Sequence, residues 1–397
     1  MSKTFKKMAL VVAFALVLAL GAAVPAFAAE PPPATPMTTT ITKNLVMADG
    51  VSVPAGGLTF NFAFAPQGAA PNINATNTLS ITINAPNATG NNTQLSTILP
   101  ALAPANAGAL DWLVTEVNDA KPNVTYDTSQ FRLRAHFRNA EAPATGTELA
   151  AVEVFRILPG SPPTEEKVND DGFVFTNAFA PNAGDESNPA ARISKTITGD
   201  RTQANLSTLF TFSATFVAPT LSDPNLPAGF VQPTLPLPFT ATIVNIATGN
   251  PITDRTSTVV FTTATQTFQL RDGERLDIPT LPAGTTMNVT ETGVPLFTPS
   301  VVIVEGNVSR AVQSAAEGAN LTTGPPPVLL RNVNVDDPLT AGLGVNAANF
   351  SNAYRWIPPS GLIMSNLPIA AVVVAVAALG LTMVMRRRKR IEELPVA

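Results

Sequence analysis

Six polar residues occupy positions where the alternation of side chains along a strand calls for an apolar one. Alternate residues of a β-strand point to opposite faces, so residues two apart share a face. Lys43, for example, is aligned with Ile41 and Leu45. The same pattern recurs for a lysine, a glutamate and an asparagine in each half of the chain: Lys43, Glu116 and Asn177, then Lys195, Glu291 and Asn352. The Glu-to-Asn spacing is 61 residues in both halves.

Such a set predicts a specific reaction. Burial lowers the pKa of a lysine and raises that of a glutamate, which favours a neutral amine beside a protonated acid. The amine is then a nucleophile, and a Glu proton shared with the Asn amide oxygen polarises the carbon under attack. The product is a Lys–Asn amide cross-link, formed once with loss of ammonia. We therefore assign Glu116 and Glu291 as catalysts of Lys43–Asn177 and Lys195–Asn352 bonds.

A structural alternative exists for the same residues. Both lysines could extend to water from strand ends, and both asparagines could cap turns. The repetition of the whole set at matching positions favours the buried triads.

Other chemistry finds little support in the sequence. The single histidine, His136, falls on the polar face of an alternating strand, without convergent partners. We find no acid pair, nucleophile elbow or metal cluster. The sequence therefore predicts no enzyme beyond the single-turnover cross-linking, and no metal or cofactor.

The elements that would position the triads are β-strands. Alternating runs broken by Pro- and Gly-rich turns favour sandwiches over βαβ units. Strands are predicted at Phe131–Arg138, Leu58–Phe64, Leu79–Ala85, Phe173–Ala180, Phe210–Phe216, Phe239–Ile246, Val259–Leu270 and Ser300–Val304. We expect an all-β protein with two tandem Ig-like β-sandwich domains, diverged copies of one unit, at residues 37–184 and 185–356. Residues 181–189 are the predicted linker.

Both ends of the chain predict export. Residues 1–28 combine a basic start, an apolar run and Ala26-Phe27-Ala28, as in a cleaved signal peptide, and residues 29–36 form a flexible start. Leu367–Met385 is nineteen residues without a charge, which predicts a transmembrane helix. Residues 386–397 begin with five cations and form the predicted basic cytoplasmic tail.

The charge balance and the cysteine content of the chain argue against a nucleic-acid-binding role and against stabilisation by disulfides. Between residues 29 and 360 there are 16 basic and 26 acidic residues, a balance that argues against a nucleic-acid partner. The chain has no cysteine, so disulfides cannot stabilise it outside the cell.

Several segments resemble known pilin domains. Asp272-Gly273-Glu274, residues 278–285 and Val289-Thr290-Glu291 are similar to a strand–turn–strand signature of Gram-positive pilins. Residues 124–129 resemble the streptococcal-type pilin isopeptide linkage domain, although the second half has no clear counterpart to this segment. Residues 175–179 and 350–354 resemble the last strand of that family. The resemblance implies Ig-like sandwiches, each tied by a Lys–Asn bond between first and last strands, with a core Glu as catalyst.

A second resemblance lies before the predicted membrane helix. Ile357-Pro358-Pro359-Ser360-Gly361 resembles a sortase sorting signal, whose usual form is Leu-Pro-x-Thr-Gly, with Ile and Ser as departures. The resemblance implies cleavage between Ser360 and Gly361 and transfer of the Ser360 acyl group to an amine. The alternative is a proline-rich spacer.

A polymer would also require an acceptor lysine. Residues 29–360 contain four lysines, and the triads use Lys43 and Lys195. In the family the acceptor commonly precedes the last strand of the N-terminal domain, which indicates Lys167, although no Tyr-Pro-Lys motif surrounds it. Lys121 is the reserve candidate. We expect Lys167 to lie in a charged, flexible segment, residues 162–171.

These observations together predict a structural subunit of a covalently polymerised, sortase-assembled cell-surface pilus. Its expected partners are sortase, other pilin subunits, and peptidoglycan or a basal pilin, with a host ligand as a further candidate. It would be a single-pass membrane precursor before sortase cleavage and would lie in the cell wall or pilus afterwards. The alternative is a wall-anchored adhesin or stalk that does not polymerise. A eukaryotic type I receptor is disfavoured by the absence of cysteine.

Overall fold

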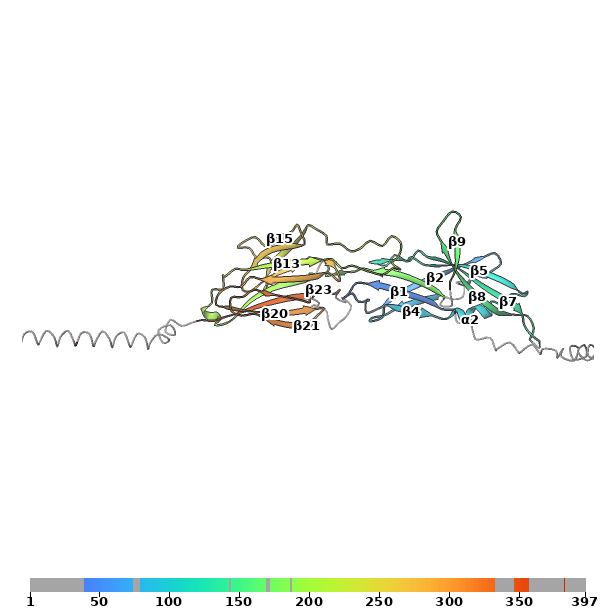
Figure 1. Ribbon diagram of the computed structural model, residues 1–397, viewed down its shortest axis with the longest axis horizontal. Helices are drawn as coiled ribbons and strands as arrows, with labels where there is room; N and C mark the ends of the chain where they lie inside the picture. The colour runs from blue at the N-terminus through green and yellow to red at the C-terminus, as the bar shows by residue number, and fades with distance from the viewer. Residues whose placement is uncertain are drawn as a thin grey trace, which may run out of the picture.

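The computed structural model describes residues 39–73, 79–142, 144–168, 172–185, 188–332 and 346–356, together with Thr382. Nearly all regular structure in these residues is β-strand, which confirms the all-β class. Figure 1 shows two β-rich halves arranged end to end along the long axis. The signal peptide, the sorting motif and the basic tail predicted from the sequence lie outside the described residues, as does the predicted membrane helix apart from Thr382. Within the described residues, no helix combines the length and apolar character needed to cross a membrane.

The N-terminal half contains a four-stranded sheet, in the order β4-β1-β10-β6, and a six-stranded sheet, in the order β3-β2-β5-β7-β8-β9. Its core combines apolar side chains from both sheets, such as Phe62 and Phe175. The elements are β1 (Ile41–Met47), β2 (Leu58–Gln67), β3 (Leu79–Ile83), β4 (Thr89–Asn92), helix α2 (Leu95–Ala101), β5 (Gly108–Glu116), β6 (Val124–Thr125), β7 (Gln130–Asn139), β8 (Thr147–Leu158), β9 (Thr164–Val168) and β10 (Phe173–Phe179).

The C-terminal half repeats this plan with more strands. A seven-stranded sheet, β15-β14-β17-β12-β24-β20-β21, accompanies a five-stranded sheet, β16-β13-β19-β22, in which β23 also pairs with β19. The elements are β12 (Ala191–Gly199), the 3₁₀ helix η2 (Arg201–Gln203), β13 (Phe210–Val217), β14 (Phe239–Asn245), β15 (Thr258–Phe261), β16 (Thr265–Leu270), β17 (Glu274–Ile278), β18 (Leu281–Pro282), β19 (Thr286–Glu291), β20 (Phe297–Glu305), β21 (Val308–Ser314), β22 (Leu321–Thr322), β23 (Val328–Leu329) and β24 (Asn346–Tyr354).

Two predicted segments differ from the structure. The single strand expected at Val259–Leu270 is wrong, because the chain turns after Phe261 and joins the opposite sheet at Thr265. The turning residues favour strands by composition, so the alternation gave no signal of the break. The predicted linker is also partly structured, because β11 (Asn182–Ala183) pairs with β18 of the C-terminal half.

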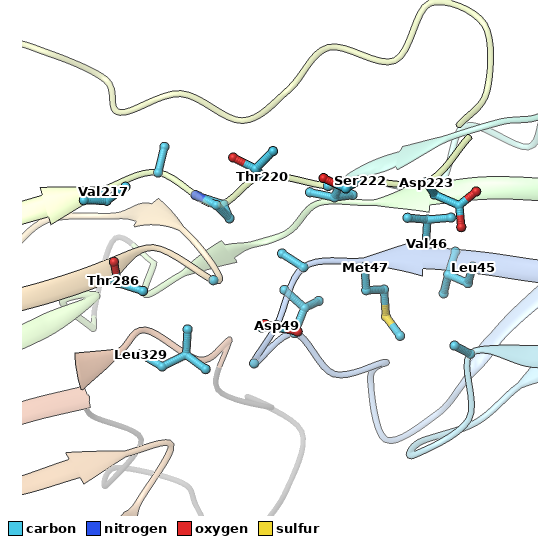
Figure 2. Close-up of a pocket in the computed structure, with 18 of the residues that line it drawn as sticks. Leu45, Val46, Met47, Asp49, Val217, Thr220, Ser222, Asp223, Thr286 and Leu329 are labelled. Carbon is cyan, nitrogen blue, oxygen red and sulfur yellow. The ribbon is translucent and has the colours of Figure 1, made fainter. Parts of the chain in front are cut away.

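The two halves are in direct contact. The loop between β13 and β14 runs back toward the N-terminal half, where Leu221 is buried against Ala48 and Ala178. Ser52 and Asn332 exchange two hydrogen bonds of 2.7 Å. A cavity of about 1130 Å³ lies at this junction. Figure 2 shows the end of β1 on one side and Thr286 of β19 on the other, with the loop residues Thr220 to Asp223 running across from one to the other.

Gly284 lies at a close approach between the two halves. Its φ is +87°, and a Cβ there would lie 2.8 Å from the Ala48 Cβ, 3.0 Å from the Pro219 Cβ and 3.1 Å from the Asp49 oxygen. An alanine would therefore meet both a strained backbone angle and three neighbours.

We predict that Gly284→Ala opens the junction. The matched control is Gly249→Ala, because Gly249 has a similar φ of +71° but no other atom within 4 Å of the position that an alanine Cβ would take. We expect Gly249→Ala to cost about 1–2 kcal/mol for the backbone angle alone and Gly284→Ala to cost about 1–3 kcal/mol more. Thermal unfolding measures the loss of stability in each variant, and limited proteolysis measures how far the chain near residues 181–190 becomes accessible. Equal behaviour of the two variants would show that the halves do not pack closely at Gly284.

Candidate functional site

The lysine and asparagine of each predicted triad lie on neighbouring parallel strands. In the N-terminal half β1 pairs with β10, and Lys43 is opposite Phe175, two residues before Asn177. In the C-terminal half β12 pairs with β24, and Lys195 is opposite Phe350, two residues before Asn352. A shift of two residues keeps both side chains on one face of the sheet, within reach of a long side chain. Both halves therefore share one register between their first and last long strands.

The glutamate of each triad comes from the opposite sheet. Glu116 ends β5 and Glu291 ends β19. Lys43 Nζ lies 2.8 Å from Glu116 Oε2, and Asn177 Nδ2 donates to Glu116 Oε1 at 2.8 Å. In the C-terminal half both partners meet Glu291 Oε1, Lys195 Nζ at 2.6 Å and Asn352 Nδ2 at 2.7 Å. Each triad thus connects the two sheets through the core.

Water is excluded from both sites. The side chains of Lys43 and Glu116 are 0% exposed, and those of Lys195 and Glu291 are 0% and 1% exposed. Burial of the lysines contradicts the alternative in which they extend to water. Phenylalanine rings surround the amines: Lys43 Nζ lies 5.0 Å from the Phe60 ring centroid, and Lys195 Nζ lies 4.0 Å from that of Phe210.

This environment shifts the pKa of all four ionisable groups. Burial lowers the pKa of Lys43 to about 8, although the neighbouring Glu116 opposes the shift. Burial likewise lowers the pKa of Lys195 to about 8, against the effect of Glu291. Burial raises the pKa of both glutamates, and the lysines oppose that change. A neutral amine and a neutral acid are therefore far more accessible here than in water.

The orientation of the asparagine amide differs from our expectation. We expected the amide oxygen to face the glutamate, but the Asn177 NH₂ group does so. The reason is a backbone donor on the other side of the amide: the N–H of Asp127 donates to Asn177 Oδ1 at 2.7 Å. An oxygen facing an N–H and an NH₂ facing a carboxyl group satisfy both hydrogen bonds. The glutamate is thus placed beside the nitrogen that would leave.

Two aspartates near the triads were missed in the sequence. Asp127 accepts hydrogen bonds from Ser129 N at 2.8 Å and Thr176 N at 2.7 Å. Asp272 accepts one from Ile197 N at 2.7 Å. The bond from Asp127 to the residue two positions later is a local turn signal that Asp127-Thr128-Ser129 could have indicated. The contact with Thr176 links distant segments and leaves no local trace.

The two candidate acceptor lysines differ in exposure. The Lys167 side chain is 60% exposed, and its Nζ lies 2.8 Å from Glu153 Oε1. Lys121 is 22% exposed and pairs with Asp119, which also accepts from the Tyr126 hydroxyl. Lys167 does not lie in a flexible loop as expected, because residues 164–168 pair with β8 as the edge strand β9. Ser360 and Gly361 fall outside the described residues.

The remaining predicted feature is the isolated His136. Its Nε2 lies 2.8 Å from Glu153 Oε2 on the outer face of the six-stranded sheet. The interaction with Lys167, followed by that with His136, lowers the pKa of Glu153 to about 2. Among the described residues, no group of three or more His, Cys, Asp or Glu side chains could hold a metal ion.

One protein family and several solved structures are similar to parts of this chain. A family profile described as "Domain of unknown function (DUF7601)" matches residues 192–321. No curated protein matches the chain. Among solved structures, the major pilin from Streptococcus pyogenes is 16% identical, with 81% of this chain and 99% of that chain covered and a TM-score of 0.32. The T3.2 major pilin from the same organism is 14% identical, with coverages of 80% and 97% and a TM-score of 0.32. A pilus-presented adhesin is 14% identical over 54% of this chain and 40% of its own, with a TM-score of 0.22.

Proposed function

We propose that the chain is a structural subunit of a covalent cell-surface pilus, strengthened by two internal Lys–Asn isopeptide bonds. One observation carries this proposal: each half buries a lysine and an asparagine on its first and last long strands, and both contact a buried glutamate from the facing sheet. A protein that only needed a stable core would gain little from a buried ion pair, because desolvation offsets the attraction. Formation of a covalent bond between the lysine and the asparagine would explain why each half buries these charged groups.

The reaction conserves atoms and charge. Lys43 transfers a proton to Glu116, and the neutral amine attacks Asn177 Cγ. The Cγ–Nδ2 bond then breaks as Glu116 passes a proton to Nδ2, which leaves as ammonia. The proton that the attacking nitrogen loses restores the acid form of Glu116. Glu291 performs the same steps between Lys195 and Asn352.

Assembly into a pilus rests on the sequence and on lysine exposure. The sorting motif at residues 357–361 gives a sortase an acyl donor at Ser360, and the predicted membrane helix holds the precursor until cleavage. Lys167 supplies the acceptor amine in the next subunit, since its side chain is 60% exposed on an edge strand. The subunit is exported, and its partners are sortase, further subunits, and a basal pilin or peptidoglycan.

The first prediction concerns the mass of the mature chain. We expect it to be lighter than the sequence mass by two molecules of ammonia, one for each triad. Glu116→Gln and Glu291→Gln should each restore one ammonia, because glutamine cannot shuttle the proton. Intact-mass spectrometry measures this. An unaltered sequence mass in the parent protein would exclude both bonds.

The second prediction concerns stability. Lys43→Met should unfold the N-terminal half at lower temperature, because the bond between Lys43 and Asn177 would close a loop of well over a hundred residues. By analogy with a disulfide, such closure contributes about 4–5 kcal/mol. Methionine preserves the apolar packing of the lysine stem and leaves no buried amine.

Calorimetry and protease sensitivity measure this loss, with Lys195→Met as the mirror variant. We expect each variant to weaken its own half, and Lys121→Ala to weaken neither. Unchanged resistance of the N-terminal half in Lys43→Met would contradict the contribution of the bond.

The third prediction concerns polymerisation. In a strain that carries the cognate sortase, Lys167→Ala should abolish the ladder of SDS-resistant polymers seen by immunoblotting of cell-wall extracts. Lys121→Ala is the matched control, because that lysine is also paired with a carboxylate but is less exposed. Loss of the ladder in Lys121→Ala alone would reassign the acceptor. A parent chain that reaches the wall without a ladder would support the non-polymerised stalk.

A further inference from the structure

We propose that the backbone N–H of Asp127 is a catalytic group in the N-terminal half, where it stabilises the oxyanion that forms on Asn177 during attack by Lys43. The carboxylate of Asp127 is the positioning group that holds this N–H in place. The inference rests on the proposed Lys–Asn bond and adds a group to its mechanism.

The first observation is the position of the donor. The N–H of Asp127 points at Asn177 Oδ1 with an N···O distance of 2.7 Å. Attack of an amine on Cγ moves negative charge onto this oxygen. An oxyanion hole places donors at about 2.7–3.1 Å from the position that the oxyanion will occupy, and the ground-state oxygen already lies within this range of Asp127 N. Asn177 is buried, and the low local dielectric around it strengthens the interaction.

The second observation is the way in which the donor is fixed. Asp127 Oδ1 accepts from Ser129 N, which closes a tight turn, and Oδ2 accepts from Thr176 N, the residue before the asparagine. The carboxylate therefore binds strand β10 one residue from Asn177, while the N–H of the same residue binds the Asn177 side chain. These contacts leave the donor little freedom to move when charge develops.

The opposite side of the amide completes the arrangement. Glu116 Oε1 accepts from Asn177 Nδ2, so the proton carrier lies beside the leaving nitrogen and the backbone donor beside the oxygen. The two tasks are divided between two groups. Glu116 moves protons from Lys43 to the departing ammonia, and Asp127 N–H stabilises charge without transferring a proton.

In the part of the C-terminal half that the structure describes, no such donor faces the asparagine. Asn352 Oδ1 and Glu291 Oε2 are buried without a hydrogen-bond partner among the described residues. A different aspartate, Asp272, lies near the second triad, and it binds the lysine strand through Ile197 N. The second triad is therefore an internal reference for the same reaction without the backbone donor.

The test follows both bonds in one refolding chain. Full-length protein is dissolved from inclusion bodies in denaturant, where the triads are not assembled, and diluted into buffer with detergent. Samples are quenched with acid and digested, and mass spectrometry quantifies linked and linear peptides for each site. In the parent we expect the first bond to form about 10-fold or more faster than the second.

The variant Asp127→Ala should slow the first bond by about 10-fold or more and leave the second unchanged. Asp127→Asn keeps one acceptor oxygen for the turn and should give an intermediate rate. Asp272→Ala is the matched control, because it removes the other nearby aspartate and should leave the first bond at the parent rate.

A pH series separates this role from a merely structural one. The reactive pair shares one proton, as a neutral amine beside protonated Glu116, so the rate falls as the pH rises through the pKa of Lys43 and that proton is lost. The charged groups that face this amine are Glu116 and Asp127, and both raise its pKa against the dominant effect of burial. Removing the Asp127 charge should therefore move this falling limb to lower pH while the plateau rate also drops. Simple misfolding would lower the rate without that shift.

The outcomes distinguish the inference from the proposed function. A parent chain that never forms the first bond would refute the bond itself. A parent that forms it, with Asp127→Ala reacting at the same plateau rate, would overturn the role of Asp127 alone. Equal slowing of both bonds in Asp127→Ala would indicate a general folding effect and would also overturn it.

Discussion

The structure of each half depends on one constraint: a lysine and a glutamate that are completely removed from water must compensate each other. Coulombic attraction at 2.8 Å and 2.6 Å offsets much of the desolvation, but a buried ion pair seldom stabilises a core more than apolar side chains would. Proton transfer from Lys43 to Glu116 removes both charges. The proposed amide then makes that removal permanent, because its nitrogen no longer gains a charge. Bond formation thus relieves the electrostatic cost that brings the residues together.

The same constraint explains the arrangement of strands around the triads. Lysine and asparagine must share one face of one sheet, and the parallel pairing of β1 with β10 and of β12 with β24 achieves this with an identical two-residue offset. Glutamate must approach from the facing sheet, at the end of β5 or β19. Phenylalanines from both sheets, including Phe62 against Phe175 and Phe212 against Phe350, exclude water from the space between them. The aromatic packing is therefore part of the chemistry as well as of stability.

Alternation along single strands was enough to predict the all-β class and to select the six residues of the two triads, because period two is a local property of the chain. It could not predict the pairing of strands more than a hundred residues apart. It also failed at Thr262–Ala264, where turn residues are compatible with a strand. The orientation of the Asn177 amide depends on a backbone N–H from residue 127, and no pattern around Asn177 reports that contact. Composition and spacing thus selected the proposed reactants, whereas tertiary structure decided which atom of each faces its partner.

The aspartate near each triad holds a different one of the two strands that the proposed bond joins. This difference affects how each half would carry a pulling force. In parallel neighbouring strands, force applied to the start of the first and the end of the last slides one past the other. A bond between Lys43 and Asn177 would carry that load before the backbone hydrogen bonds of β1 and β10 do. The turn held by Asp127 binds β10 beside the bonded residue, so it restrains the strand at the point of greatest load. In the C-terminal half Asp272 restrains β12 instead. The restrained strand carries the asparagine in the N-terminal half and the lysine in the C-terminal half. The N-terminal half is also the one in which a backbone N–H polarises the asparagine amide for attack.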